Sequence, residues 1–317
     1  MRETTASMAD AEDLSGVVEE IADRVRRRIQ AARVGREEPC TAVPGPGSAP
    51  ARAAAAKDDG DECAPECGGC PNVDSCATVM AVKAGAGRIA PDRIRTSADI
   101  APYIDHTLLK PDATREDVVK LSEEARKYGF ATVCVNSANV GTAARVLSGS
   151  KTVPIAVVGL PLGAALPSAK AFEAREAVRC GAREIDMVIN IGALKHRDFA
   201  LVLNDIQSVV NASRPHPVKV ILETSQLSTE EKIAGCALAK AAGAAFVKTS
   251  TGFTGGGATA EDVALMRKVV GDEIGVKASG GVRSSEDAMK MIAAGANRIG
   301  ASASVAIVTG QKSTAKY

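Results

Sequence analysis

Residues 228–251 read STEEKIAGCALAKAAGAAFVKTST, and they contain one complete unit of the pattern that decides the fold. Segment 228–243 has apolar residues at helical spacing and ends in Gly243, a residue type common just past a helix. The short run that follows, 245–251, is typical of a buried strand. A helix followed directly by a buried strand predicts an α/β unit of a parallel sheet.

The same alternation repeats along the chain from about residue 97. Amphipathic segments such as REDVVKLSEEARKYG (115–129) separate short runs rich in β-branched residues. Runs such as VPIAVVG (153–159) are apolar throughout, as expected of strands buried on both faces. The predicted strands are Tyr103–Asp105, Ala131–Asn136, Pro154–Gly159, Glu184–Asn190, Val218–Glu223, Ala245–Thr251, Gly275–Ser279 and Arg298–Ala301.

Eight strand–helix units favour a closed barrel over an open sheet. A (β/α)8 barrel typically needs about 250 residues, and the chain has 317. The alternative is a doubly wound open sheet, but its G-x-G-x-x-G turn after the first strand is absent. We therefore predict an α/β fold, a (β/α)8 TIM barrel over residues 97–317, with an N-terminal helical and linker extension.

Composition excludes several classes of partner. The 39 basic and 38 acidic residues leave a net charge of +1, which gives no electrostatic case for nucleic acid or a membrane surface. No run of 18 apolar residues suggests a membrane span, and the polar N-terminus lacks the apolar core of a signal peptide. We expect a cytoplasmic protein without nucleic-acid or membrane partners.

Two lysines interrupt apolar strands at the predicted barrel mouth, where such barrels carry their active sites. Lys248 lies in AFVKTSTGF and Lys277 in GVKASGGVR, while Asp186 lies in EIDMVIN. Burial and a nearby like charge both lower the pKa of an ammonium group, and a neutral lysine can attack a carbonyl carbon. Each lysine could instead pair with a carboxylate and only stabilise the barrel. The combination with Asp186 favours Schiff-base chemistry.

Glycine-rich turns follow the last three predicted strands and suggest a phosphate site. Backbone N–H groups in such turns bind phosphate oxygens, and barrels commonly place this site after strands seven and eight. No GxxxxGK[ST] motif is present, so a nucleoside triphosphate is not indicated. The residues concerned are Gly252, Gly255, Gly256, Gly257, Gly280, Gly281, Gly300 and Ser302.

Five motifs give the segment from about residue 97 to 317 a specific resemblance: DHTLL (105–109), EIDMVIN (184–190), FVKTSTGF (246–253), KASGGVR (277–283) and RIGAS (298–302). In order and spacing they resemble the deoxyribose-phosphate aldolase family of class I aldolases. The resemblance implies a phosphorylated sugar substrate, 2-deoxy-D-ribose 5-phosphate, cleaved reversibly to acetaldehyde and D-glyceraldehyde 3-phosphate. It also leads us to expect a homodimer or higher homo-oligomer. Another class I aldolase acting on a phosphorylated sugar is the alternative.

The resemblance also implies roles for single residues. Lys248 would be the Schiff-base nucleophile, Lys277 would tune its pKa, and Asp186 with Lys277 would relay protons through water. A C-terminal tyrosine, here Tyr317, helps to move a proton at the enamine carbon in some members, although a disordered terminus is the alternative. The expected substrate-binding residues are Asp105, Cys134, Thr249, Gly252, Gly280, Gly281, Gly300 and Ser302.

Two features of this sequence qualify those expectations. A second serine often follows the phosphate-binding one in the family, but Ala303 stands there. One phosphate contact is therefore missing or supplied by Ser304. Cys134, in TVCVN, matches a cysteine of some relatives and is expected to pack near the pocket without acting as a nucleophile.

A metal-dependent class II aldolase is the rival enzyme. It would need several histidine or acidic ligands around one ion, and the histidines are only His106, His196 and His216. A non-catalytic, cluster-bearing barrel scaffold is a further alternative. Retention of Asp186, Lys248 and Lys277 together argues against it.

The first 96 residues contain no aromatic residue and divide into an amphipathic helix (1–35), a flexible Pro/Gly/Ala-rich linker (36–60) and a cysteine segment (61–96). Four close thiols can hold a [4Fe–4S] cluster or complete a zinc site. The tight spacing favours iron–sulfur over zinc or no metal, and the barrel chemistry itself needs no cofactor. The cysteines are Cys63, Cys67, Cys70 and Cys76.

Residues 10–34 have one apolar stripe at helical spacing and a densely charged opposite face. The helix can pack on the barrel or on another subunit. Alternatively, the helix and linker resemble an encapsulation peptide that directs enzymes into bacterial microcompartments. In that case residues 10–34 would bind shell proteins and confine the volatile acetaldehyde.

Overall fold

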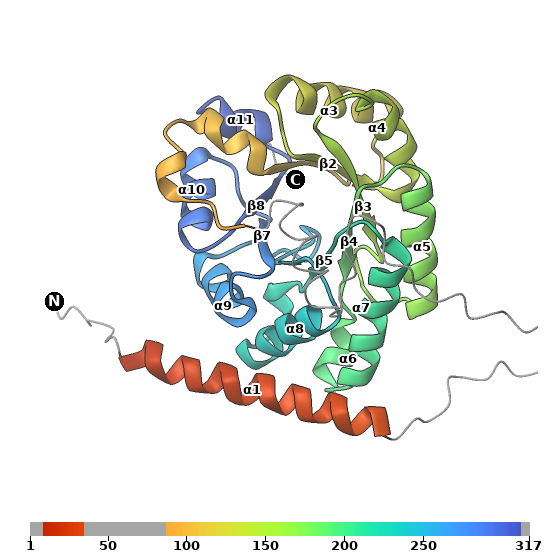
Figure 1. Ribbon diagram of the computed structural model, residues 1–317. Helices are drawn as coiled ribbons and strands as arrows, with labels where there is room; N and C mark the ends of the chain where they lie inside the picture. The colour runs from red at the N-terminus through yellow and green to blue at the C-terminus, as the bar shows by residue number, and fades with distance from the viewer. Residues whose placement is uncertain (1–8, 35–86, 312–317) are drawn as a thin grey trace, which may run out of the picture.

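The computed structural model describes residues 9–34 and 87–311 of the chain. Eight parallel strands pair in chain order, and β1 closes the barrel against β8 (Figure 1). The predicted TIM barrel is therefore confirmed. The strands are β1 (Ile104–Leu108), β2 (Thr132–Asn136), β3 (Val153–Val158), β4 (Glu184–Val188), β5 (Val218–Ile221), β6 (Phe246–Lys248), β7 (Gly275–Ser279) and β8 (Arg298–Ala301).

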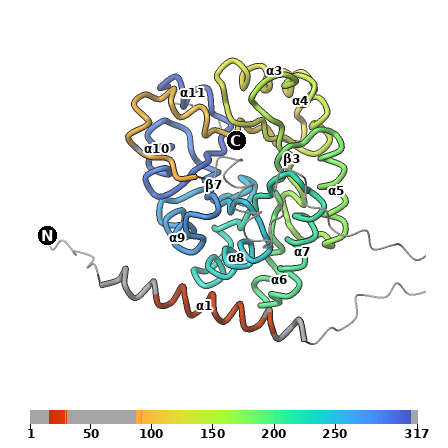
Figure 2. The backbone as a smooth tube through the Cα atoms, viewed as in Figure 1, coloured from red at the N-terminus to blue at the C-terminus, as the bar shows by residue number. Residues whose placement is uncertain are grey.

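Helices surround the barrel, as the backbone trace shows (Figure 2). One long helix, α1 (Ala9–Val34), precedes them, and short 3-10 segments such as η3 (Ser97–Tyr103) join some elements. The helices around the barrel are α3 (Arg115–Tyr128), α4 (Val140–Val146), α5 (Pro167–Arg179), α6 (Ile191–Lys195), α7 (Phe199–Ser213), α8 (Thr229–Ala241), α9 (Ala260–Val270), α10 (Ser285–Ala293) and α11 (Ser304–Val308).

Helix α3 illustrates how the sequence sets these elements. The Thr114 side chain accepts a hydrogen bond from the Asp117 N–H group and caps the start of the helix. Gly129 ends it with a φ of 70° in the left-handed region, where glycine has no steric cost. Val118 and Leu121 are buried one turn apart. Full burial of such a side chain stabilises the fold by about 1.5–3 kcal/mol.

The predicted strands lie where the barrel has them, with shifts at their ends. Tyr103 belongs to η3, so β1 begins one residue later than predicted and continues to Leu108. Strands β5 and β6 end at Ile221 and Lys248, earlier than predicted. The segment after β5 still follows β6, because the Leu222 N–H group donates to the Lys248 carbonyl at 2.9 Å. The regular strand stops because Glu223 turns to a φ of 60°.

Alternation along each strand divides the side chains between two environments. On β4, Ile185 and Met187 belong to the main hydrophobic core, whereas Asp186 contacts lysines of other strands inside the barrel. Part of the interior is apolar, with Cys134 and Ile155 in a separate small cluster. The charged part of the interior positions the site described below.

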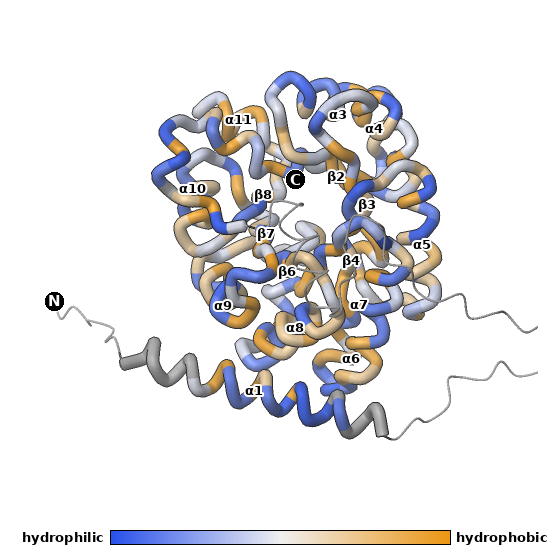
Figure 3. The backbone as a smooth tube through the Cα atoms, in the orientation of Figure 1, coloured by the Kyte–Doolittle hydropathy of each residue, from blue (hydrophilic) through white to orange (hydrophobic). Residues whose placement is uncertain are grey.

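Helix α1 lies across α7 and α8 on the outside of the barrel (Figures 1 and 3). Val18, Ile21 and Val25 are buried there and belong to the main core cluster. The Arg24 guanidinium lies 3.3 Å from the Glu230 carboxylate of α8. A helix lies where residues 10–34 predict one, and these three residues of its apolar stripe pack on the barrel helices, one of the two interpretations that the sequence left open.

The described residues also define where the barrel begins. Ile89 is buried, and the Asn297 side chain donates to the Gly87 carbonyl at 2.8 Å, so contacts with the barrel start before residue 97. The predicted linker, the four cysteines of the predicted metal site and Tyr317 lie outside the described residues. No helix within residues 9–34 and 87–311 is long and apolar enough to cross a membrane.

Candidate active site

A cavity of about 300 Å³ opens at the C-terminal ends of the strands. Strand ends and loops of β1, β6, β7 and β8 enclose it, as expected for this fold. The lining residues are Thr107, Leu109, Lys248, Thr251, Gly252, Gly255, Gly256, Gly257, Ser279, Gly280, Gly281, Val282, Arg283, Gly300, Ala301, Ser302 and Ala303.

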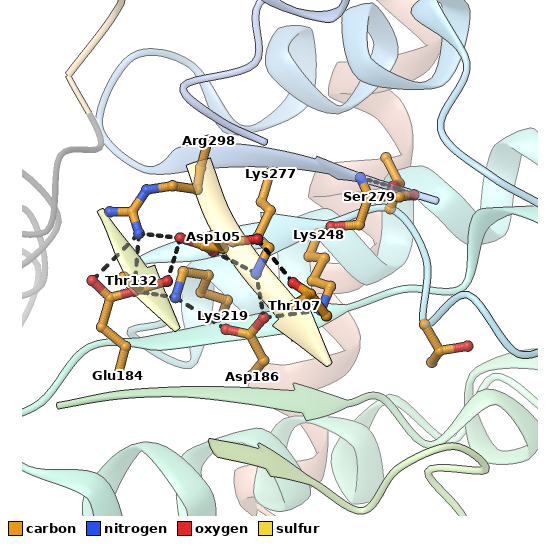
Figure 4. Close-up of polar contacts among 12 residues, drawn as sticks. Asp105, Thr107, Thr132, Glu184, Asp186, Lys219, Lys248, Lys277, Ser279 and Arg298 are labelled. Carbon is orange, nitrogen blue, oxygen red and sulfur yellow. Dashed lines mark hydrogen bonds and ion pairs between the residues drawn. The ribbon is translucent and has the colours of Figure 1, made fainter. Parts of the chain in front are cut away.

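Lys248 is the lysine that reaches this cavity. It ends β6, is 2% exposed, and donates from Nζ to Asp186 Oδ2 at 2.9 Å. Strand pairing places Lys248 directly beside Lys277 of β7. The Lys277 Nζ atom donates to the same carboxylate oxygen at 2.7 Å, so one acidic group joins both amines (Figure 4).

A second carboxylate holds Lys277 from the other side. Asp105 Oδ2 lies 2.5 Å from Lys277 Nζ, and Asp105 Oδ1 accepts from Arg298 at 2.8 Å and from Thr132 at 2.7 Å. Strands β1, β4, β6, β7 and β8 therefore meet in one buried network (Figure 4). Lys277 lies beneath the cavity and is absent from its lining, whereas Lys248 is exposed to it.

The network extends deeper through residues that the sequence analysis did not select. Lys219 Nζ donates to Asp186 Oδ1 at 3.0 Å and to Glu184, which also accepts from Arg298 at 3.2 Å. Four basic side chains, those of Lys219, Lys248, Lys277 and Arg298, thus share three carboxylates, those of Asp105, Glu184 and Asp186.

Charge pairing fixes which groups stay ionised. Burial favours the neutral acid, but Lys219, Lys248 and Lys277 together hold the pKa of Asp186 well below its usual range. Burial likewise opposes the charged form of Lys277, yet Asp105 and Asp186 raise its pKa far above the ordinary value. The expectation that burial lowers the pKa of both lysines is therefore wrong for Lys277, which remains an ammonium ion.

Glycines allow the close approaches that shape the cavity. A Cβ atom on Gly300 would lie 2.9 Å from Lys277 Cε and closer still to Ser279 Oγ. A Cβ atom on Gly257 would lie 2.7 Å from the Gly280 carbonyl oxygen, so the loops after β6 and β7 touch. The expected phosphate-site glycines thus meet around one cavity, together with Ser302.

Comparison with known proteins agrees with this geometry. The family model for DeoC/LacD family aldolases matches residues 100–313. The chain belongs to this family. Deoxyribose-phosphate aldolase of Listeria welshimeri is 60% identical over 214 residues, which cover 67% of this chain and 96% of the relative. That of Halalkalibacterium halodurans is 60% identical over 223 residues, 70% of this chain and 100% of the relative.

A solved structure supports the same assignment. The tetrameric deoxyribose phosphate aldolase from Aeropyrum pernix is 30% identical and superposes with a TM-score of 0.65, covering 74% of this chain and 96% of that one. The family, the class I aldolase assignment and the barrel fold are thus established for residues 100–313.

Some expected substrate-binding residues of this aldolase do not line the cavity. Asp105 belongs to the network below it, and Cys134 is buried in an apolar cluster, where burial raises the pKa of its thiol. The Thr249 hydroxyl donates to the Ser279 carbonyl and accepts from the Ser279 N–H, each at 3.0 Å. Ser304 donates to the Ala301 carbonyl at 2.8 Å and does not line the cavity.

Two polar side chains that the sequence pattern did not single out also line the cavity, those of Thr251 and Arg283. The position of Arg283, directly after the Gly280–Gly281 turn, could have indicated a cation beside the phosphate site. Within residues 9–34 and 87–311, no group of three His, Cys, Asp or Glu side chains could hold a metal ion.

Proposed function

We propose that this aldolase cleaves 2-deoxy-D-ribose 5-phosphate to acetaldehyde and D-glyceraldehyde 3-phosphate through a Schiff base on Lys248. The observation that carries the proposal is the convergence of Lys248, Lys277 and Asp186 beneath a cavity rimmed by glycine-rich turns. Relatives at 60% identity carry the name deoxyribose-phosphate aldolase. In this arrangement, one substrate molecule in the cavity can contact both the Lys248 amine and the glycine-rich turns that would bind its phosphate group.

The first chemical steps join Lys248 to the sugar. The Lys248 nitrogen adds to C1 of the open-chain aldehyde and forms a carbinolamine, whose hydroxyl takes a proton and leaves as water. A protonated imine remains. Because Lys277 and Lys248 bond the same oxygen of Asp186, protons can pass between these groups and the hydroxyl, directly or through water.

Cleavage then breaks the C2–C3 bond. The C3 hydroxyl loses its proton, the electron pair of the C2–C3 bond moves towards the imine, and an enamine forms as glyceraldehyde 3-phosphate leaves. Protonation of the enamine at C2 and addition of water release acetaldehyde and free Lys248. We assign the proton transfers to Asp186 and Lys277, and general acid–base steps of this kind contribute about 10²–10⁴-fold each.

Borohydride trapping tests this assignment. Reduction in the presence of acetaldehyde or the sugar phosphate should attach the carbon chain to Lys248, as located by peptide mapping. Omission of the aldehyde and a Lys248→Met variant are the controls. Modification at another lysine, or turnover that EDTA abolishes without any trapping, would contradict the proposal. Comparing phosphorylated sugars as substrates separates this activity from that of another class I aldolase.

Tyr317 is proposed to assist protonation of the enamine carbon. A Tyr317→Phe variant should exchange the methyl protons of acetaldehyde with D2O more slowly than the wild type, because this exchange runs through the enamine. Its trapping at Lys248 should be unchanged. Equal exchange rates would assign the transfer to other groups.

For the extension, we propose that Cys63, Cys67, Cys70 and Cys76 bind a [4Fe–4S] cluster with a structural, regulatory or redox-sensing role. The support is their spacing, which differs from the paired C-x₂-C units of most zinc sites. Absorbance near about 400 nm with matching iron and sulfide analysis would support the cluster. Stoichiometric zinc, or no metal, would contradict it.

We also propose that α1 targets the enzyme to a bacterial microcompartment, on the basis of its amphipathic pattern and following linker. Shell proteins would have to compete with α7 and α8 for Val18, Ile21 and Val25, because these side chains pack on the barrel. Shell proteins should co-purify with the intact chain and not with a chain lacking residues 1–40. Equal recovery would refute this role.

Finally, we propose a homo-oligomer. The relative from Aeropyrum pernix is tetrameric. In this chain, large apolar side chains are exposed just before α5 and within it, with Leu162 at 73% and Phe172 at 57% exposure, and contact with another subunit would bury them. Light scattering should give a multiple of the 32.5 kDa chain, and a Leu162→Glu variant should lower it. A monomeric wild type would contradict this proposal.

A further inference from the structure

Glu223, which lies in the loop after β5, combines two features that destabilise a folded chain: a buried polar side chain and a left-handed backbone conformation. It is fully buried, and its φ of 60° and ψ of 63° lie in the left-handed region that favours glycine. Within residues 9–34 and 87–311, only one other non-glycine residue, Arg197, has a positive φ. Among these residues, the side chain of Glu223 hydrogen-bonds to Thr251 and forms no ion pair. Strained, buried polar residues of this kind concentrate at functional sites.

The carboxylate is used to hold a turn. Glu223 Oε2 accepts hydrogen bonds from both the backbone N–H group, at 3.1 Å, and the hydroxyl group of Thr251. The Thr251 hydroxyl oxygen in turn accepts from the Phe253 N–H group at 3.1 Å. Between them, Gly252 has a φ of 92°. One carboxylate oxygen thus fixes the side chain and the backbone of the turn 251–253.

This turn belongs to the wall of the active-site cavity. Thr251 and Gly252 line the cavity with Lys248, whereas Glu223 does not. The chain on either side of Glu223 is anchored as well, because the Thr224 N–H group donates to the Thr249 carbonyl at 3.0 Å. Glu223 therefore lies behind the cavity wall, and its carboxylate acts on bound ligands through Thr251.

We propose that Glu223 is a positioning residue that holds the turn 251–253 in the shape required to receive the phosphate group of the substrate. The inference rests on the proposed function for the identity of that substrate. Two hydrogen bonds to one side-chain oxygen, from the N–H group and the hydroxyl group of the same residue, restrain both the backbone and the side chain of a glycine-containing loop. The orphaned second oxygen, Oε1, is buried and makes no hydrogen bond to any described residue, so Oε2 carries the whole restraint.

Kinetics with two substrates test this role. In Glu223→Ala, KM for 2-deoxyribose 5-phosphate should rise about 10-fold, equivalent to about 1.4 kcal/mol, while kcat changes by less than about threefold. For unphosphorylated 2-deoxyribose, kcat/KM should also change by less than about threefold. Glu223→Gln keeps an acceptor oxygen and should restore most of the phosphate-dependent affinity. Thr251→Val removes the hydroxyl at nearly constant volume and should show the same phosphate-dependent rise in KM.

Several outcomes would overturn the inference. These are an unchanged KM in Glu223→Ala, an equal loss of kcat/KM with both sugars in that variant, or a KM in Glu223→Gln as high as in Glu223→Ala. If Glu223→Ala does not fold, the Glu223→Gln and Thr251→Val pair decides, because a structural role alone would affect both sugars equally.

A binding measurement separates this inference from the proposed function. Inorganic phosphate should raise the melting temperature of the wild type and protect Glu223→Gln similarly, but it should protect Glu223→Ala and Thr251→Val only at concentrations about 10-fold higher. This readout needs no turnover. A wild type that neither cleaves the sugar phosphate nor is trapped by borohydride would refute the proposed function, while equal phosphate affinity in all variants would refute the role of Glu223.

Discussion

Replacing Asp186 by asparagine removes the one carboxylate that joins both active-site lysines. Asp186 lies within 3.0 Å of Lys219, 2.9 Å of Lys248 and 2.7 Å of Lys277, with its side chain fully buried. An asparagine keeps the shape but has only one acceptor oxygen, so its amide group must face at least one of these cations. We expect kcat to fall by about 10²–10⁴-fold, the usual contribution of a general acid–base group.

The same change must also destabilise the barrel, because breaking a buried ion pair costs about 3–5 kcal/mol. In a domain of this size each kcal/mol lowers Tm by about 2–4 °C, so a decrease of roughly 6–20 °C is expected. Stability alone could then mimic a catalytic defect. The assay must therefore measure kcat well below the Tm of the variant, together with borohydride trapping of acetaldehyde.

Asp205 provides a matched control. Its carboxylate is fully buried on α7 and lies 2.6 Å from Lys170 Nζ on α5, outside the barrel interior. Asp205→Asn should lower Tm by a similar amount while kcat stays within about threefold of the wild type. If Asp186→Asn keeps kcat within about tenfold of Asp205→Asn, the reasoning that assigns proton transfer to Asp186 is refuted.

Three further predictions follow from the packing and the charges. Gly300→Ala should lower kcat by about 10²-fold, because its Cβ would lie 2.9 Å from Lys277 Cε and displace that amine. Gly192→Ala, whose Cβ would make only an ordinary contact of 3.7 Å with Asn190 Oδ1, is the control in the same cleavage assay. The buried network should leave Tm flat between about pH 5 and 9. Because the pKa of Asp186 is lowered, the stabilisation by its charge is lost only on acidification below about pH 4. Because the pKa of Lys277 is raised, the stabilisation by its charge is lost only above about pH 10. A Tm that changes steeply inside that window in the wild type, and no longer does so in Lys277→Met, would contradict this charge assignment. Ile21→Asp should detach α1, seen as faster hydrogen exchange of that helix with unchanged kcat, whereas Val17→Asp, at a position 40% exposed, should not.

The fold and the centre of the site follow from sequence because both depend on local patterns. Strands and helices of the barrel alternate with clear periodicity, and a lysine inside an apolar strand stands out as costly. This cost points to Lys248 and Lys277, and the structure brings both amines within hydrogen-bond distance of Asp186. Strand ends do not follow from the pattern alone, since a single left-handed residue, Glu223, prevents β5 from continuing.

The deeper part of the site could not be predicted from one sequence. Glu184, Lys219 and Arg298 lie at or near the starts of their strands, where charged residues usually face solvent. Only the closure and pairing of the barrel show that all three point inward and meet. Likewise, the apolar stripe of α1 predicts a helix with one buried face. The sequence does not say what covers that face, and the structure identifies α7 and α8.

The carboxylates explain why two neighbouring lysines can have different roles. Lys277 contacts both Asp105 and Asp186, and this pairing keeps it an ammonium ion despite complete burial. Lys248 contacts Asp186 alone and borders the cavity. Among the four basic side chains that share the three carboxylates, only Lys248 borders the cavity, where substrate can reach it. Lys248 can therefore serve as the nucleophile, while Lys277 contributes a fixed positive charge and a proton donor beside it.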